Sequence, residues 1–328
     1  MKTIAAILAG GSGTRIGGAL PKQLLPLGGK PVLEHSVATF NAHPRVDAIV
    51  IVCREDLIPT VQEIVSRGGY GKVRAVVPGG DTRFMSSLAA IRAAMNCDRS
   101  GGDSPGGAFS GGAVSDGASS GGAVSCASSG GALTCLSPDN AACSSDDRGD
   151  CQDAILLHDA ARPLVDEALI DRCLDALAEY DAVEPAIPLA DTVVRVDDAG
   201  HLADVPPRAA LRAVQTPQCF RLSVLADAYR RALNGAGLDG ACTGARAGSG
   251  TGAGPCIGAD SGAAAGTCLG TDSGAGIDAG AGLAAFTDDI SVVRHCFPEL
   301  PVKIVDGSPR NIKLTVPSDL PILEALLG

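Results

Sequence analysis

The residues best suited to chemistry lie near the N-terminus, in the stretch LAGGSGTRIGGALPKQ at positions 8–23. Gly10, Gly11 and Gly13 lack side chains and permit positive φ, so successive backbone N–H groups can face a phosphate chain. Arg15 and Lys22 add fixed positive charge at the same place. This combination is suited to binding a nucleoside triphosphate.

Two familiar phosphate-binding motifs do not account for this stretch. A P-loop requires GxxxxGK[ST], which the sequence lacks, and the dinucleotide fingerprint requires a third glycine where Ile16 stands. An ordinary glycine turn is the alternative interpretation of residues 10–13 taken alone. The PKQ that follows at 21–23 makes that alternative less favourable.

A second group of polar residues follows a short apolar segment, in HDAARP at 158–163. Ligands of parallel α/β sheets bind beyond the carboxyl ends of the strands, so Asp159 and Arg162 are candidate ligand-binding residues. A local ion pair between these two side chains is the alternative interpretation. We expect His158 to be structural.

The elements that must position these residues alternate along the chain. We predict strands at 2–8, 47–53, 73–77, 154–157 and 183–188, and helices at 31–41, 56–66, 81–95 and 166–180. Asp81 is predicted to be the N-cap of its helix. Strands separated by helices favour an α/β fold with a mostly parallel sheet flanked by helices.

Two segments, 98–150 and 234–283, consist mainly of Gly, Ala, Ser, Thr, Asp and Cys. Such compositions bury too little apolar surface to offset the entropy of ordering the backbone, so we predict two disordered insertions in one domain spanning 1–328. They carry net charges of −5 and −3, which accounts for most of the formal charge of −11. The acidity therefore belongs mainly to the insertions.

Composition excludes several classes of protein. No apolar run approaches the ~20 residues of a membrane-spanning helix, and the N-terminal apolar run is interpreted as a buried strand rather than an export signal. The 12 cysteines form no CxxC pair and no Cys/His spacing typical of zinc sites. We expect a cytoplasmic protein with reduced thiols that binds neither membrane nor nucleic acid.

Six segments occur in an order that resembles one enzyme family. They are AGGSGTR with a following PK (9–22), PGGDTR (78–83), HDAARP (158–163), DTVVRV (191–196), AVQTPQCF (213–220) and NIKLTVPSDL (311–320). Together they resemble the 2-C-methyl-D-erythritol 4-phosphate cytidylyltransferases of non-mevalonate isoprenoid synthesis. The resemblance implies a Rossmann-like nucleotidyltransferase fold, and transfer of CMP from CTP to a polyol phosphate with Mg²⁺ or another divalent cation.

The resemblance also assigns roles to residues. It implies catalytic roles for Arg15, Lys22 and Lys313, although an exposed loop lysine is the alternative for each lysine. It implies CTP binding by Ala9, Gly10, Gly11, Gly13, Gly80, Asp81, Ser86, Asp159 and Ala160, and acceptor binding by Arg162, Thr192, Arg208, Thr216 and Thr287. The metal is expected to be held mainly by the CTP phosphates, near Asp159.

Residues 188–211 read as two short strands around a DDAGH turn. In the family that this chain resembles, such a hairpin is an arm that crosses into a neighbouring subunit, so the resemblance implies a homodimer. The hairpin is all that the residues themselves predict.

Several features leave alternatives open. The AGGSGTR loop is closer to the related ribitol 5-phosphate cytidylyltransferases, whereas HDAARP and AVQTPQ are closer to the methylerythritol branch, so D-ribitol 5-phosphate is the alternative acceptor. Arg212 stands where an aromatic residue is common, and the second insertion separates a helix expected at QTPQ from Thr287. A nucleotide-binding protein without catalysis would be expected to lack one of the three catalytic cations.

Overall fold

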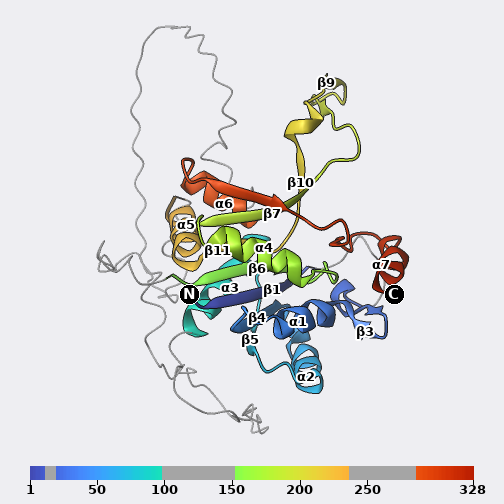
Figure 1. The fold of residues 1–328 in the computed structure, drawn as a ribbon, viewed down its shortest axis with the longest axis vertical. Coiled ribbons are helices and arrows are strands. Elements are labelled where there is room, and N and C mark those ends of the chain that lie inside the picture. Colours follow the sequence, from blue (N-terminus) through green and yellow to red (C-terminus); the bar gives the residue numbers. More distant parts are fainter. Residues whose placement is uncertain (12–19, 98–151, 236–285) are drawn as a thin grey trace, which may run out of the picture.

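A computed structural model describes residues 1–11, 20–97, 152–235 and 286–328 (Figure 1). Gly13, Arg15 and nearly all of the two predicted insertions lie outside these residues. Helix α5 runs to Gly235, so the predicted start of the second insertion at 234 falls inside that helix.

A mixed, mostly parallel sheet forms the centre of the fold. Its order is β10-β7-β11-β6-β1-β4-β5, with β12 paired to β7 as an eighth strand. Strands β1, β4, β5 and β6 are mutually parallel, whereas β10 and β11 run antiparallel to their neighbours. The strands are β1 (Thr3–Ala9), β4 (Ala48–Cys53), β5 (Val73–Pro78), β6 (Ala154–Asp159), β7 (Ala182–Pro188), β10 (Arg212–Val214), β11 (Gln218–Arg221) and β12 (Val302–Asp306). The predicted fold class is confirmed.

Helices cover both faces of this sheet (Figure 1). Residues of α1, α2 and α4 join one apolar cluster, and residues of α3, α5 and α6 join another on the opposite face. The helices are α1 (Val32–Ala42), α2 (Ile58–Gly68), α3 (Arg83–Cys97), α4 (Glu167–Leu177), α5 (Leu222–Gly235), α6 (Asp289–Cys296) and α7 (Asp319–Leu327). No helix in the described ranges is both long and apolar enough to cross a bilayer.

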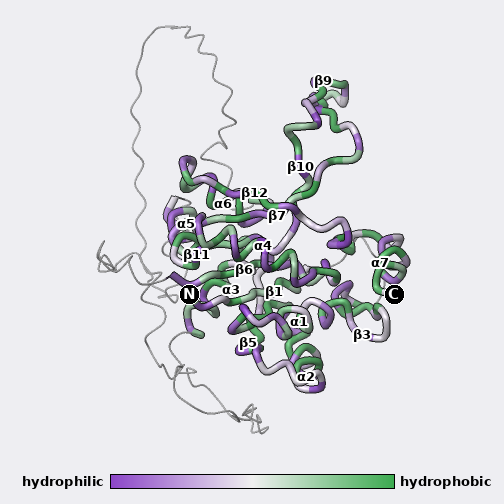
Figure 2. The backbone as a smooth tube through the Cα atoms, viewed as in Figure 1, coloured by the Kyte–Doolittle hydropathy of each residue, from purple (hydrophilic) through white to green (hydrophobic). Residues whose placement is uncertain are grey.

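Strand β1 shows why the sheet is buried on both faces. Successive side chains of a strand point to opposite faces, and a parallel strand covered on both sides is apolar throughout. Ile4, Ala6 and Leu8 accordingly pack into one cluster, and Ala5 and Ile7 into the other. The hydropathy colouring in Figure 2 follows the same apolar strands through the centre of the body.

Two local predictions are wrong. Helix α3 begins at Arg83, and the Thr82 hydroxyl, not Asp81, accepts a hydrogen bond from the Met85 N–H at 3.2 Å. The reason is that Asp81 still belongs to the turn that leaves β5. The QTPQ segment (215–218) is not helical, because it connects β10 to β11 across the sheet. The Gln215 N–H donates to the Pro185 carbonyl of β7 at 2.8 Å, and Gln218 begins β11 and pairs with Leu157 of β6.

The segment between β7 and β10 extends away from the body (Figure 1). Within it, β8 (Arg195–Val196) and β9 (Leu202–Asp204) pair antiparallel around a turn in which Gly200 has a φ of 81°. The same segment contains the 3-10 turn η5 (Arg208–Ala210). Short elements elsewhere are β2 (Pro26–Leu27), β3 (Lys30–Pro31) and the 3-10 turns η1 (Lys22–Leu24) and η2 (Glu55–Leu57). We call residues 189–211 the arm.

Candidate active site

A cavity of about 570 Å³ lies at the carboxyl ends of β1, β4, β5 and β6. The strands end side by side, because Leu8 pairs with Asp159, and Cys53 pairs with both Ala9 and Pro78. Sequence-predicted residues that line it are Ala9, Gly10, Gly11, Lys22, Gly80, Asp81, Ser86, Asp159, Ala160 and Lys313. The sheet therefore brings ten of the predicted site residues to one place.

One part of the cavity wall is made of backbone. A Cβ on Gly79 would lie 2.9 Å from the Ser86 Oγ and 3.2 Å from Val52, so a side chain there requires the neighbours to move. Ser86 is nearly buried and its hydroxyl donates to the Gly80 carbonyl at 3.2 Å. This packing holds the turn after β5 close to α3.

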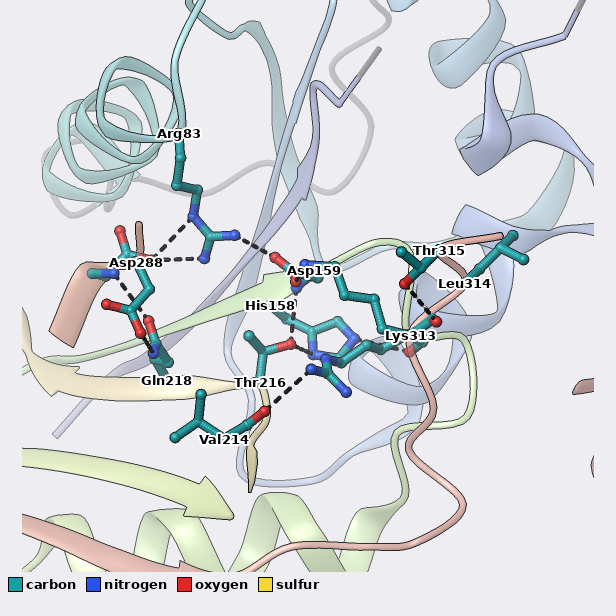
Figure 3. A network of polar contacts seen from close by, with 12 residues as sticks. Arg83, His158, Asp159, Val214, Thr216, Gln218, Asp288, Lys313, Leu314 and Thr315 are labelled. Atoms are coloured by element: carbon teal, nitrogen blue, oxygen red, sulfur yellow. Dashed lines mark hydrogen bonds and ion pairs between the residues drawn. The ribbon is translucent and has the colours of Figure 1, made fainter. Parts of the chain in front are cut away.

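Asp159 is the central charge of the site (Figure 3). Its side chain is largely buried and forms ion pairs with Arg83 and with the Lys313 ammonium, the latter at 2.7 Å. Burial by itself would raise the pKa of Asp159, but the two cations outweigh burial and hold that pKa well below its usual range. The carboxylate is therefore ionised before any ligand arrives.

Arg83 is a site residue that sequence reasoning missed. Its guanidinium lies between Asp159 and Asp289, donating from Nη2 and Nε to one Asp289 oxygen at 2.7 and 3.2 Å. Asp289 is fully buried and also accepts from the Tyr229 hydroxyl at 2.6 Å. Burial lowers the pKa of Arg83, and the two carboxylates more than reverse that effect.

A signal for Arg83 was present in the sequence, since PGGDTR ends at this residue. Its importance depends on Asp289, which is 206 positions away along the chain and beyond the second insertion. No local pattern predicts such a contact.

Two lysines, Lys22 and Lys313, line the same cavity from other elements. The Lys22 ammonium, at the start of η1, lies 3.4 Å from the carbonyl of Leu314, the residue after Lys313. The described residues that line the cavity include four cations, Lys22, Arg54, Arg83 and Lys313, and two carboxylates, Asp81 and Asp159. An excess of positive charge around a small cavity is suited to a polyphosphate.

Arg162 lies beside the cavity without lining it. Its guanidinium donates to the carbonyls of Asn311 at 2.7 Å and Val214 at 3.3 Å. Burial lowers the pKa of Arg162 more than the nearby Asp159 raises it. Because Asp159 is paired with Arg83 and Lys313, the alternative of a local Asp159–Arg162 ion pair is not observed.

Thr216 and His158 support Asp159 from behind (Figure 3). The Thr216 hydroxyl accepts from the Asp159 backbone N–H at 3.1 Å and contacts the His158 ring at 3.2 Å. His158 is fully buried, and burial lowers its pKa to about 4. The imidazole is thus neutral near pH 7, as a structural role requires.

The remaining predicted acceptor residues lie apart from this cavity. Arg208, at the base of the arm, lines a second hollow of about 680 Å³ together with Arg212, and donates to the Ala190 carbonyl at 2.8 Å. Thr192 is exposed on the arm, and Thr287 is exposed just before α6. The cavity of one chain is therefore lined by every predicted CTP residue except Gly13, which lies outside the described residues, whereas Thr192, Arg208 and Thr287 do not line it.

The donor set around Asp159 limits what metal it can hold. The described residues contain no group of three or more His, Cys, Asp or Glu side chains arranged as a metal site. Mg²⁺ is commonly bound by one or two carboxylates together with substrate phosphates and water. Asp159 at the edge of the cavity fits a metal of that kind, held mainly by a substrate.

Comparison with solved structures supports the fold. The chain is similar to 4-diphosphocytidyl-2C-methyl-D-erythritol synthase from Anaerococcus prevotii, with a TM-score of 0.59 and 22% sequence identity, over 99% of this chain and 98% of that one. At this identity the likeness shows the fold alone.

Sequence comparison reaches further. The chain is 36% identical to 2-C-methyl-D-erythritol 4-phosphate cytidylyltransferase of Thermobifida fusca, over 99% of this chain and 93% of the relative. It is 29% identical to the bifunctional ribulose 5-phosphate reductase/CDP-ribitol pyrophosphorylase of Haemophilus influenzae, over 99% of this chain but 48% of that protein. The family model described as 2-C-methyl-D-erythritol 4-phosphate cytidylyltransferase matches residues 3–99, 145–248 and 275–328. The chain therefore belongs to the 2-C-methyl-D-erythritol 4-phosphate cytidylyltransferase family.

Proposed function

We propose that this protein transfers CMP from CTP to 2-C-methyl-D-erythritol 4-phosphate and releases pyrophosphate, as a step of isoprenoid synthesis. The observation that carries the proposal is the cavity at the strand ends, which four cations and the ionised carboxylate of Asp159 line in a chain of this family.

The reaction requires no side-chain nucleophile. A phosphate oxygen of the acceptor attacks the α-phosphorus of CTP, a new P–O bond forms, and the bond to the β-phosphate breaks as pyrophosphate leaves. Negative charge accumulates on the α- and β-phosphate oxygens, so fixed cations lower the barrier by electrostatic stabilisation. Lys22 and Lys313, which line the cavity, are proposed to supply it, with Arg15 as the further cation that the family resemblance implies.

Asp159 and Arg83 are proposed to hold the charged groups of the cavity in position before the substrate binds. Because Asp159 is held by cations from α3 and from the chain before α7, its carboxylate is fixed in position before CTP binds. A divalent cation such as Mg²⁺, when bound near Asp159, would neutralise part of the triphosphate charge. We propose that CTP exchanges some of these protein ion pairs for its own phosphates.

The backbone-lined wall is proposed to hold cytosine. Cytosine presents an exocyclic amine and a ring carbonyl, which backbone acceptors and donors at Gly80, Asp81 and Gly10 can recognise. Ser86, bonded to the Gly80 carbonyl, fixes the turn that carries them. Ala9 and Ala160 provide the small side chains that a flat base requires.

The arm is proposed to complete the active site of a second subunit in a cytoplasmic homodimer. Five apolar side chains are exposed along this one segment, with Val196 and Leu202 at 59% and 65%, and exposed apolar residues that gather in this way are typical of interaction surfaces. An arm that docks on a partner would bring Thr192 and Arg208 to the partner's cavity, where Arg162, Thr216 and Thr287 are proposed to complete the acceptor site.

Subunit complementation tests the shared site. Lys22→Ala and Arg208→Ala variants, each inactive alone, are mixed after unfolding and refolding together. If each site combines Lys22 of one chain with Arg208 of the other, heterodimers contain one intact site, and about a quarter of wild-type activity returns. No recovery, in a mixture that contains heterodimers, would contradict the shared site.

The acceptor is tested by pyrophosphate release from CTP and Mg²⁺ with two acceptors at equal concentration. The proposal expects higher kcat/KM with 2-C-methyl-D-erythritol 4-phosphate than with D-ribitol 5-phosphate. The second acceptor is the alternative, favoured by the AGGSGTR loop and by the similarity to a CDP-ribitol pyrophosphorylase. A clear preference for ribitol 5-phosphate would replace the proposed acceptor and retain the cytidylyl transfer.

A further inference from the structure

Arg54 lines the main cavity and has no role in the transfer described above. It directly follows β4, whose last residue Cys53 pairs with Ala9 on one side and Pro78 on the other. The Gly79 N–H also donates to the Cys53 carbonyl at 2.8 Å. Arg54 therefore leaves the sheet between the two backbone segments that are proposed to recognise cytosine.

The guanidinium of Arg54 is held along one edge. Its Nε donates to Asp56 Oδ1 at 2.9 Å and its Nη2 to Asp56 Oδ2 at 2.6 Å, and Asp56 lies in η2 immediately after it. A bidentate pair fixes the plane of the guanidinium as well as its position. The two side chains are 46% and 56% exposed, and an exposed pair of this kind stabilises a fold very little.

A planar cation held by one edge leaves its two faces available. Guanidinium groups stack on aromatic rings, and this interaction is worth roughly 0.5 to 2 kcal/mol depending on solvent exposure. The geometry points to Arg54 as a nucleobase contact. One face of its guanidinium packs against the cytosine of bound CTP, while Asp56 binds the Nε–Nη2 edge and fixes the plane of the group. This inference rests on the proposed function, because it requires CTP in this cavity.

Arg45 provides a matched control. It is also an arginine held by carboxylates, with Nη1 at 3.0 Å from Asp171 and 2.7 Å from Asp175, and it is 39% exposed. It precedes β4 instead of following it, so it lies at the amino end of the strands, away from the cavity. Loss of an exposed, carboxylate-paired arginine is thus common to both variants, and only Arg54 lines the cavity.

The experiment measures initial rates against CTP concentration for the full-length wild type, Arg54→Ala, Arg54→Lys and Arg45→Ala. For Arg54→Ala we expect the KM for CTP to rise roughly 3- to 30-fold with kcat within twofold, since a contact to the base is equally present in the ground and transition states. Arg54→Lys keeps the charge but not the plane, so its KM is expected to stay raised. Arg45→Ala is expected to match the wild type.

Three results would overturn the inference. A wild-type KM in Arg54→Ala would mean that the side chain does not contact CTP. An equal loss of kcat and kcat/KM would place it on the reacting phosphates, and a wild-type KM in Arg54→Lys would show that charge alone matters. If the wild type itself releases no pyrophosphate from CTP, the proposed function fails. If the wild type is active and Arg54→Ala has the same KM, only the inference about Arg54 fails.

Discussion

The cavity and the arm differ in whether their side chains find partners within one chain. In the cavity, Asp159 and the fully buried Asp289 find partners on α3, on α5 and in the chain before α7, all within one described chain. In the arm, Val196 and Leu202 are mostly exposed, and two short strands form its only sheet among the described residues. A two-stranded hairpin is marginally stable by itself in water.

This difference teaches which part of the active site each chain can build alone. The proposed nucleotide side is preorganised, because Asp159 is already paired with Arg83 and Lys313 and the turn after β5 is packed against Ser86. Two of the proposed acceptor residues, Thr192 and Arg208, are carried by the arm, which has no core of its own. We therefore expect substitutions in the cavity to change folding or catalysis directly, and equivalent changes in the arm to leave the body intact.

The largest effect on stability is expected from Asp289→Ala. This change leaves Arg83 and the Tyr229 hydroxyl without their shared buried acceptor, and breaking a buried pair costs about 3–5 kcal/mol in the free energy of unfolding. Urea denaturation measures it. Asp204→Ala removes the exposed arm pair with Arg195 and is expected to cost less than about 1 kcal/mol. Equal losses of unfolding free energy in the two variants would contradict the proposed difference between the buried cavity pair and the exposed arm pair.

The largest effect on catalysis is expected from Lys22→Ala. Loss of one preorganised cation typically lowers turnover by about 100- to 1000-fold, or roughly 3–4 kcal/mol, while the fold is retained. Lys30→Ala is the control, because Lys30 is an exposed lysine on β3 outside the cavity lining. The comparison uses kcat from pyrophosphate release, and near-normal turnover of Lys22→Ala would refute its assigned role.

Glu184 makes the stability of the body depend on pH. It is buried on β7, and burial raises its pKa to about 7, although the hydrogen bond from Gln218 at 2.6 Å opposes this. A raised carboxyl pKa stabilises the folded state fully below the unfolded pKa of about 4.5, and this stability is lost as pH rises toward 7.

Glu184→Gln removes the cost of burying that charge. We expect the variant to be more stable than the wild type by about 1–3 kcal/mol at pH 8, and the difference to shrink toward pH 5. Thermal unfolding at both pH values measures this. A difference that does not vary with pH would show that Glu184 keeps an ordinary pKa.

A matched pair of glycines gives the smallest expected effect. Gly69 ends α2 with a φ of 64°, and Gly200 lies in the arm turn with a φ of 81°. An alanine is strained by about 1 kcal/mol or more in this left-handed region. Gly69→Ala should lower the global free energy of unfolding by that amount, whereas Gly200→Ala should strain only a hairpin that opens locally. Equal global losses would mean that the arm unfolds together with the body.

Much of this site was predictable from local sequence. The apolar strands predicted that Asp159 lies at the carboxyl end of a sheet strand, and the order of the motifs implied that Lys22 and Lys313 belong to the same site. All three line the cavity. The Arg83–Asp289 pair was not predictable, since it joins residues on either side of the second insertion. The antiparallel strands β10 and β11 were missed because short segments take their structure from their partners in the sheet.

For the arm, the sequence predicts the turn but not what covers its exposed apolar side chains. Its turn is visible in DDAGH, because a glycine there permits positive φ. Val196 and Leu202 would be covered only in the proposed homodimer, and a contact between subunits cannot be predicted from the sequence pattern of one chain. The cap of α3 was misplaced by one residue for a simpler reason: Asp81 and Thr82 are both good N-cap residues, and only the path of the turn selects between them.

The central claim is that the cavity around Asp159 transfers CMP. The most direct test follows label from [α-³²P]CTP into 2-C-methyl-D-erythritol 4-phosphate, in the wild type and in Lys313→Ala, with CTP binding measured on the same preparations. The account predicts labelled product from the wild type and at least about 100-fold slower transfer by a folded Lys313→Ala. Transfer at the wild-type rate by that variant, or no labelled product from a wild type that binds CTP, would contradict it.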